Sequence, residues 1–107
     1  MHNYVILIGR LTDNMKSTEK EITIAVNRDY KNKDGIYETD FIDIQLSVTM
    51  AANVGEYCRK GDLVGIQGRL ETIIEEDKDG TKRKRTIVVA DKMTFLSSRQ
   101  SSASDND

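Results

Sequence analysis

The sequence predicts a small all-β domain, a five-stranded barrel with one short helix. Apolar and polar residues alternate with a period of two in several segments, as in strands with one buried face. Two Asp-Gly pairs, Asp34-Gly35 and Asp79-Gly80, lie between such segments, as in β-hairpin turns. Residues 50–60, between two strand-like segments, carry apolar residues at helical spacing. Strands that flank one short helix favour a small barrel.

Length and composition limit the class of protein. The chain has 107 residues, 37% of them hydrophobic and 32% charged, and it lacks proline and tryptophan. This is typical of one globular domain with a single core. No apolar segment approaches the roughly 20 residues that cross a bilayer. The one cysteine, Cys58, cannot form an internal disulfide, so we expect a cytoplasmic protein.

The first strand, expected over residues 4–11, is apolar on both of its faces. A single small domain cannot easily cover both faces, whereas a second copy of the chain can. We therefore expect a homo-oligomer with this strand at or near the interface. The expected interface residues are Tyr4, Val5, Ile6, Leu7 and Ile8.

The second strand is expected over residues 21–27 and the third over residues 41–48, joined by a hairpin with Asp34-Gly35 as its turn. In both strands the branched residues have even numbers and so lie on one face. Phe41 has an odd number, so its side chain lies on the opposite face and is expected outside the core. The residues expected inward are Ile22, Ile24, Val26, Ile42, Ile44, Leu46 and Val48.

The helix is expected over residues 50–60, with Thr49 as its N-cap and Gly61 directly after its end. The residues expected on its buried stripe are Val54, Tyr57 and Cys58.

The last third of the chain repeats the hairpin design. A fourth strand is expected over residues 62–74, where Gly65 and Gly68 allow a bulge or a sharp bend. A charged tip leads to a closing strand over residues 86–96. From residue 97 on, the polar, serine-rich tail has nothing to bury and is expected to be disordered. The domain is therefore residues 1–96 and the tail residues 97–107.

Five strands with a helix between the third and the fourth, and long hairpins joining strands 2–3 and 4–5, form the arrangement of an OB-fold. Six short motifs over residues 4–96 also closely resemble the bacterial single-stranded DNA-binding protein family, in the family's order. The motifs are VILIGRLT, TIAVNRDY, TDFIDIQL, YCRKGD, GIQGRLET and VVADKMTFL. The resemblance implies an OB-fold subunit, usually in a homotetramer, that coats single-stranded DNA without sequence preference during replication, recombination and repair.

Binding of single strands requires aromatic rings on which bases stack. The resemblance implies stacking by Tyr30 and Phe41, and Tyr37 shares the parity of Phe41. Two interpretations of Tyr37 stay open: it stacks on a base, or its ring caps the hairpin or packs against the barrel. Tyr30 has the parity of the buried residues before it, so its exposure requires a twist or bulge in the strand.

Two positions depart from the family. Ser47 stands late in the third strand, where a further aromatic is common, and Ile74 or Glu75 stands before the second hairpin tip, where the family usually has Trp or Tyr. The four cations of residues 82–85 are the expected compensation for these missing rings. Their alternative role is a solvated arm that balances nearby acids. Because alternate strand residues point to opposite faces, each interpretation can hold for half of the four.

Positive charge is local in this chain. Without the tail residues Arg99, Asp105 and Asp107, 15 basic residues stand against 16 acidic ones, a net charge of −1. Affinity for phosphates would therefore come from clusters. Arg10 and Arg69 also have a second interpretation, as partners of neighbouring carboxylates. The expected phosphate contacts are Arg28, Lys31, Lys33, Lys82, Lys84, Arg10 and Arg69.

The sequence lacks the residue patterns of catalysis and metal binding. One histidine, His2, and one cysteine, Cys58, cannot make a Cys/His zinc site or a nucleophile–base pair. Residues 77–80 are faintly similar to a calcium loop, but Val88 stands where the bidentate Glu is needed. We expect no enzyme activity, no metal and no cofactor.

A function of a different class also fits: an OB-fold adaptor, similar to the dimeric primosome proteins related to this family, that mainly binds proteins and holds nucleic acid weakly. The missing rings and near-neutral charge favour the adaptor, whereas Tyr30, Phe41 and the basic run favour DNA binding. Replication and repair proteins stay open as partners. The chain ends in Ser-Asp-Asn-Asp, without the apolar tip of the family's recruiting tails.

Overall fold

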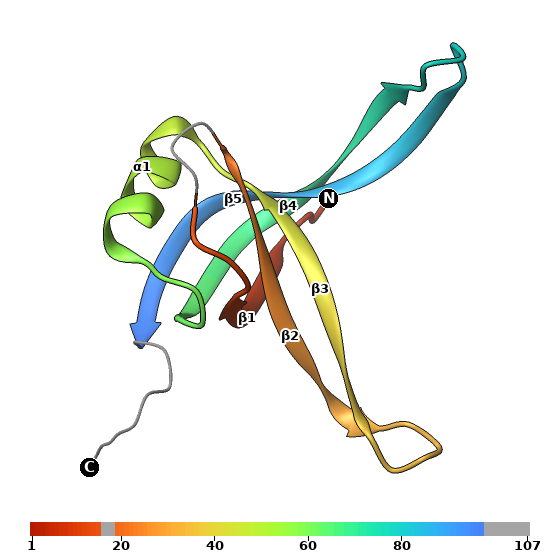
Figure 1. The fold of residues 1–107 in the computed structure, drawn as a ribbon. Helices are drawn as coiled ribbons and strands as arrows, with labels where there is room; N and C mark the ends of the chain where they lie inside the picture. Colours follow the sequence, from red (N-terminus) through yellow and green to blue (C-terminus); the bar gives the residue numbers. More distant parts are fainter. Residues whose placement is uncertain (16–18, 98–107) are drawn as a thin grey trace, which may run out of the picture.

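The computed structural model describes residues 1–15 and 19–97 and shows a closed five-stranded barrel with one helix (Figure 1). The strands follow the order β1-β2-β3-β5-β4 around the barrel, and every neighbouring pair is antiparallel except β3 with β5. This confirms the predicted OB-type arrangement. The elements are β1 (Val5–Leu11), β2 (Glu21–Lys31), β3 (Tyr37–Gln45), α1 (Val48–Tyr57), β4 (Leu63–Glu76) and β5 (Lys82–Ser97). The predicted tail lies, from residue 98 on, outside the described residues.

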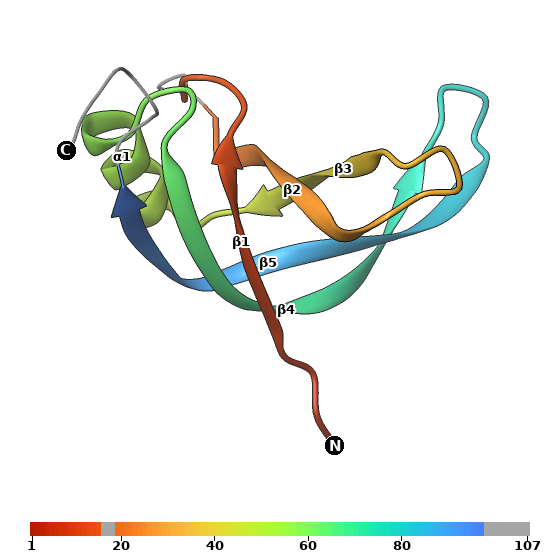
Figure 2. The ribbon, with the colours of Figure 1, turned by 90° about the horizontal axis from the view of Figure 1, so that it is seen from below.

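Two hairpins extend beyond the barrel, on the side away from α1, and diverge from each other (Figures 1 and 2). We call residues 27–40 the β2–β3 arm and residues 71–87 the β4–β5 arm. Their strands run further than predicted: β2 continues to Lys31, and β5 begins at Lys82. The alternation of buried and polar residues stops where the core stops, but backbone pairing between the two strands continues. The basic run of residues 82–85 therefore lies on a strand, whereas Lys33, Asp34 and residues 77–79 lie in the turns.

Both predicted turns are present. Gly35 and Gly80 have φ angles of 79° and 86°, in the left-handed region that glycine adopts without strain. The backbone N–H of each donates to the carbonyl three residues earlier, Asn32 for Gly35 and Asp77 for Gly80. These turns set the register of the two arms.

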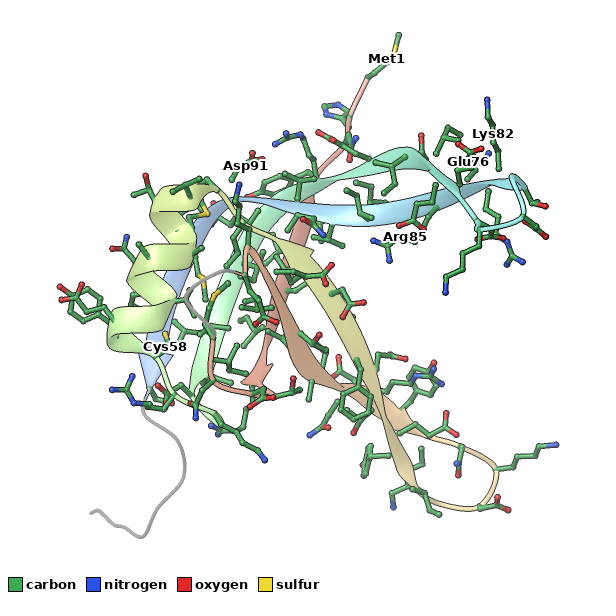
Figure 3. The ribbon with its side chains drawn as sticks, turned by 45° about the horizontal axis from the view of Figure 1, so that its top comes forward. Met1, Cys58, Glu76, Lys82, Arg85 and Asp91 are labelled. Atoms are coloured by element: carbon green, nitrogen blue, oxygen red, sulfur yellow. The ribbon has the colours of Figure 1, made fainter. Side chains whose placement is uncertain are left out.

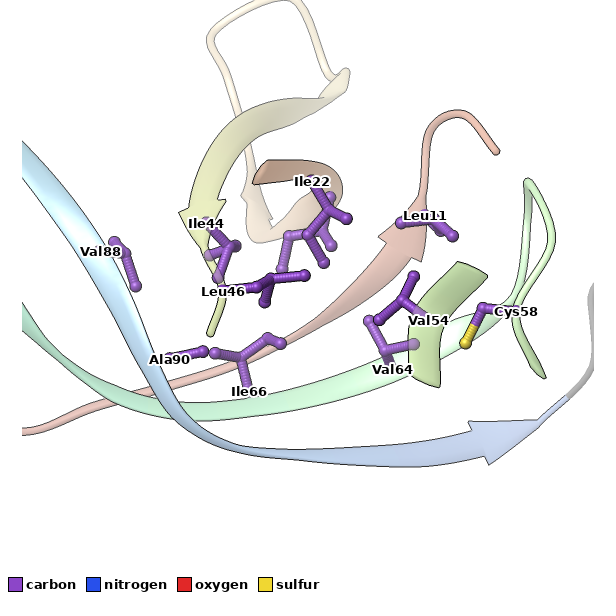
Figure 4. Close-up of a cluster of buried hydrophobic side chains, with 11 residues drawn as sticks. Leu11, Ile22, Ile44, Leu46, Val54, Cys58, Val64, Ile66, Val88 and Ala90 are labelled. Atoms are coloured by element: carbon purple, nitrogen blue, oxygen red, sulfur yellow. The ribbon is translucent and has the colours of Figure 1, made fainter. Parts of the chain in front are cut away.

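The core fills the barrel with branched side chains from all five strands and the helix (Figure 4). The prediction is confirmed for Ile22, Ile24, Ile44 and Leu46, which are buried. Val48 was expected inward but is exposed, because β3 ends at Gln45 and Val48 begins the helix. The buried residues are Leu11, Ile22, Ile24, Ile44, Leu46, Val54, Cys58, Val64, Ile66, Val88 and Ala90.

The helix α1 begins two residues earlier than predicted. Ser47, and not Thr49, is the N-cap, and its hydroxyl accepts a hydrogen bond of 3.1 Å from the backbone N–H of Met50. At the other end Cys58 is the C-cap, so the helix stops before Gly61. The backbone N–H of Cys58 still donates to the Val54 carbonyl, 2.9 Å away. Both Val54 and Cys58 are buried, as predicted, and connect the helix to the core.

Tyr57 was predicted on the buried stripe of α1 but is exposed. The helix buries only Val54 along its length, and Cys58 enters the core after the helical turn has ended. Tyr57 is the last helical residue and points away from this narrow contact.

Two glycines allow neighbouring strands to approach closely. A Cβ atom at Gly9 would lie 2.6 Å from the Ala25 carbonyl oxygen of β2, and one at Gly68 would overlap the Val89 carbonyl of β5. The β4–β5 register shifts between Gln67 and Gly68, but the extra residue of this bulge is Asp91 of β5, so the prediction that the fourth strand bulges at Gly68 was wrong. The pairing at Gly65 is regular.

Candidate nucleic-acid interface

Each strand has an inner face, turned toward the core, and an outer face, turned away from it. The even-numbered residues of β3, β4 and β5 up to residue 90 lie on the inner face, as buried Ile44, Val64 and Val88 show. In the arms, where the core ends, this inner face is open to solvent. In β3, β4 and β5, even residue numbers up to residue 90 therefore mark side chains on the inner face and odd numbers mark side chains on the outer face.

Phe41 lies on the outer face of β3, directly opposite Ala25 of β2, and is 69% exposed. The next residues on that face, Thr39 and Asp43, are polar and hydrogen-bond to β2 side chains. The small alanine and the polar neighbours leave the ring of Phe41 uncovered within this chain. This agrees with its predicted place outside the core.

Tyr37 lies on the same face, at the outer end of the β2–β3 arm. Its register partner is Lys31, whose ammonium nitrogen lies 5.7 Å from the centre of the Tyr37 ring, a cation–π contact. Tyr37 is 56% exposed, so the ring does not pack against the barrel. Lys33, in the turn beyond, is exposed.

Tyr30 lies within an irregular part of β2. Asn27 pairs with Thr39 and Lys31 pairs with Tyr37, so three β2 residues stand opposite a single β3 residue. This is the register irregularity that the exposure of Tyr30 required, and Tyr30 is 64% exposed.

Arg28 is engaged by two carboxylates of β3. Its Nε and Nη2 donate to the two oxygens of Asp40 at 3.1 and 2.9 Å, and its Nη1 donates to Glu38 at 2.6 Å. The hydrogen bond from Arg28 lowers the pKa of Asp40, and the same bond is the main cause of the raised pKa of Arg28. One guanidinium thus stands beside two carboxylates, a cluster that has a net negative charge.

The four cations of the β4–β5 arm separate by face, with Lys82 and Arg85 projecting to opposite sides (Figure 3). On the outer face the Nε of Arg83 lies 3.0 Å from Asp77, and that of Arg85 lies 3.5 Å from Glu75. On the inner face, within the part of the chain that the structure describes, Lys82 and Lys84 have no ion-pair partner.

Two aliphatic residues accompany these lysines on the inner face. Ile74 stands directly opposite Lys84 in the ladder and is 65% exposed, and Leu70 lies on the same face of β4, nearer the barrel. Sequence reasoning missed Leu70, because in a continuous strand pattern it looks like a core residue. Its exposure follows from its position at the end of the core.

Arg10 and Arg69 follow their second interpretation in part. Arg69 pairs with Glu71 at 2.8 Å and also with Asp91, and these partners raise its pKa. Arg10 donates to the backbone carbonyl of Gly61 at 2.9 Å. Arg69 lies on the outer face of β4, as Gln67 does, which pairs with Ile6 of β1.

The first strand separates into two faces. Tyr4, Ile6 and Ile8 are exposed, whereas Val5 and Leu7 are half-buried and pack against the core. Hence only three of the five residues expected at an interface present their side chains outward.

The side chain of Asn3 holds the start of β1 in place. Its Nδ2 donates to the Leu70 carbonyl at 2.7 Å, and its Oδ1 accepts from the Leu70 N–H at 2.8 Å. Through these two hydrogen bonds the Asn3 side chain pairs with the backbone of β4 just beyond the β1–β4 ladder. No sequence pattern indicated this arrangement.

A metal site requires clustered ligand side chains, and a membrane-spanning helix requires a long apolar segment. Among residues 1–15 and 19–97, no three His, Cys, Asp or Glu side chains gather as they would around a metal ion. Within the same residues, the single helix α1 has 10 residues and is too short to span a membrane.

Comparison with known proteins identifies relatives over nearly the whole chain. Residues 2–96 match the model of the single-strand binding protein family. A single-stranded DNA-binding protein of Staphylococcus aureus (strain MRSA252) is 40% identical, over 100% of this chain and 73% of its own length. Single-stranded DNA-binding protein B of Bacillus subtilis (strain 168) is 38% identical, over 90% of this chain and 91% of its own.

The fold also has a solved counterpart. The structure of a Plasmodium falciparum SSB in complex with ssDNA matches with a TM-score of 0.68 and 21% identity, over 90% of this chain and 96% of that chain. At this identity the likeness concerns the fold alone. Together with the family match over residues 2–96, these relatives show that the chain belongs to the single-strand binding protein family.

Proposed function

We propose that this protein binds single-stranded DNA without sequence preference and protects exposed strands in replication, recombination and repair. The observation that carries this proposal is the family match over residues 2–96, which covers the whole barrel and both arms. The chemistry of the described surface supports it, because exposed rings and unpaired cations are the groups that sequence-independent binding of single strands requires.

Phe41 is the principal stacking residue in this proposal. Its ring is 69% exposed, its neighbours Thr39 and Asp43 on that face are polar, and burial of a base against it would remove apolar surface from water. Tyr30 and Tyr37, on the same arm and also exposed, are proposed as further stacking residues. Lys31 already contacts Tyr37, so a base would use the ring face that Lys31 leaves open.

Phosphates are proposed to contact Lys82 and Lys84 on the inner face of the β4–β5 arm, and Lys31 and Lys33 on the other arm. An unpaired ammonium exchanges water and counterions for a phosphate, whereas a cation in an ion pair must first lose its carboxylate. By this argument Arg69, which has two acidic partners, contributes less than the lysines.

A homo-oligomer, either a tetramer or a dimer, is proposed through the outer face of β1. Ile6 and Ile8 of β1, and Tyr4 directly before it, are exposed apolar residues, which favours burial against a second copy. On β4 the neighbouring position is Gly65, and a Cβ there would lie 4.0 Å from Ile8 and 3.5 Å from Leu96, so the apolar surface continues to β5. The single, buried Cys58 supports a reducing compartment such as the cytoplasm.

The adaptor function is less favoured. The relatives reported above are named as single-stranded DNA-binding proteins, and an adaptor would not need exposed Phe41 or unpaired Lys82 and Lys84.

The test is a titration of labelled oligo-dT, beside a duplex of equal length, at low and moderate salt. Tight binding to the single strand only, weakened by salt, is the expected result. Equal and weak binding to both ligands would contradict the proposal and favour the adaptor. Light scattering on the same samples gives the number of subunits.

A further inference from the structure

The β2–β3 arm has a weak point in its backbone ladder. Between the pairs Asn27 with Thr39 and Lys31 with Tyr37, β2 has two more residues than β3. A bulge of this kind leaves backbone groups unpaired and allows the strand to bend. Tyr30 lies in this segment, so the ladder alone does not hold its backbone in one position.

Arg28 is the first residue of this irregular segment, and its side chain reaches across to β3. It forms two hydrogen bonds to Asp40 and one to Glu38, and the second oxygen of Glu38 accepts from the Asn32 amide at 3.2 Å. Asn32 in turn accepts backbone N–H groups of the turn, from Asp34 and Ile36. We call Arg28, Asp40, Glu38 and Asn32 the Arg28 cluster. It connects β3 to the hairpin turn across the part of the arm where the ladder is irregular.

The same geometry makes Arg28 a poor ligand for phosphate. A bidentate pair with a carboxylate is the strongest arrangement a guanidinium makes with an amino-acid side chain, and a second carboxylate is present. An approaching phosphate would meet net negative charge. Arg28 and Tyr30 belong to the same irregular segment of β2, two residues apart, between the ladder pairs of Asn27 and Lys31.

We propose that Arg28 is a positioning residue: through Asp40 and Glu38 it holds the irregular segment of β2, and so presents Tyr30 to a base, without contacting phosphate itself. This deepens the proposed function and rests on it. It also replaces the direct role expected for Arg28 from the sequence. Arg28 then affects affinity through Tyr30 and not through the number of phosphates bound.

The Asp40→Asn variant separates the two roles because they predict opposite changes. If Arg28 contacts phosphate, loss of the Asp40 charge frees the guanidinium and strengthens binding. If Arg28 positions Tyr30, the same loss weakens the cluster and lowers affinity by roughly 3- to 10-fold. This is smaller than the roughly 5- to 150-fold loss expected when a stacked base is lost completely, because Tyr30 itself is still present. Asp43→Asn, on the outer face of the same strand, is the matched control for loss of one negative charge.

Salt dependence and a double-mutant cycle complete the test. Arg28→Gln is expected to lower affinity for oligo-dT with an unchanged salt slope, and to have no further effect when Tyr30 is already alanine. A slope lower by about 0.7, or equal losses with and without Tyr30, would overturn the proposal. Thermal unfolding of each variant verifies that the barrel is intact. Failure of the unaltered protein to bind oligo-dT would instead refute the proposed function.

Discussion

Lys84 stands directly opposite Ile74 across the β4–β5 ladder, on the inner face of the arm, while its neighbours Arg83 and Arg85 are paired with acids on the outer face. One run of four cations therefore has two chemical roles. The two lysines are available for a phosphate, and the two arginines are part of the arm's own charge balance.

This division predicts different salt dependence for two double variants. Lys82→Ala with Lys84→Ala should reduce the salt slope of oligo-dT binding by about 0.7 for each phosphate that is no longer neutralised, or about 1.4 in total. Arg83→Ala with Arg85→Ala removes the same formal charge and is the matched control. Its slope should change much less. Equal reductions in the two double variants would contradict the assignment by face.

A second prediction concerns Phe41. Replacement by alanine should weaken oligo-dT binding roughly 5- to 150-fold, because stacking of one base contributes about 1 to 3 kcal/mol to the binding free energy. The melting temperature should stay close to that of the unaltered protein, because the ring is exposed and contributes little to the core. Tyr57→Ala removes an equally exposed ring from α1 and should leave binding unchanged. Unchanged affinity of Phe41→Ala would remove Phe41 from the site.

A third prediction concerns the outer face of β1. Ile6→Glu with Ile8→Glu should shift the mass measured by light scattering toward the 12.1 kDa of a single chain, because two carboxylates at an apolar interface lose hydration without gaining partners. Ile36→Glu alters another exposed isoleucine, in the turn of the β2–β3 arm, and should leave the mass unchanged. A double variant that keeps the full oligomer mass would place the interface elsewhere.

A fourth prediction follows from the lowered pKa of Asp40. Because this pKa is lower in the folded chain than the value near 3.9 of an unfolded chain, the ionised carboxylate stabilises the fold above about pH 4, and this contribution is lost as the pH falls through the folded-state pKa. The unaltered protein should therefore melt at a higher temperature than Asp40→Asn at neutral pH. The difference should close below about pH 4. A difference that does not change with pH would show that Asp40 acts through its shape alone.

The sequence was sufficient for the barrel, because one-sided strands give a clear period of two. Ile22, Ile24 and Ile44 needed no tertiary information. The errors lie at the helix, where local signals compete. Ser47 and Thr49 are both good N-caps, and only the end of β3 at Gln45 decides between them. The spacing of Tyr57 along the helix is that of a core residue, but the contact between the helix and the barrel is too narrow to bury its ring.

The candidate site was predictable in its residue types and less so in its pairings. The exposure of Phe41 was predictable, because alternation along the third strand alone places it on the face opposite to the buried residues. That Arg28 is neutralised by Asp40 depends on the register of two strands joined by a hairpin with an irregular ladder. The alternation of side-chain direction along a strand correctly predicted that the four cations of residues 82–85 divide between two faces, two on each. Which pair meets the acids follows from the three-dimensional course of the arm.

The close approaches at Gly9 and Gly68 determine the circumference of the barrel. At each glycine a carbonyl of the next strand lies so near that an added methyl group would collide with it, so these strand pairs approach more closely than a side chain would allow. An added methyl group at either position would lengthen the ring and widen the lumen that eleven apolar side chains now fill. The size of the barrel interior thus depends on the lack of a side chain at Gly9 and Gly68 as well as on the apolar side chains that fill it.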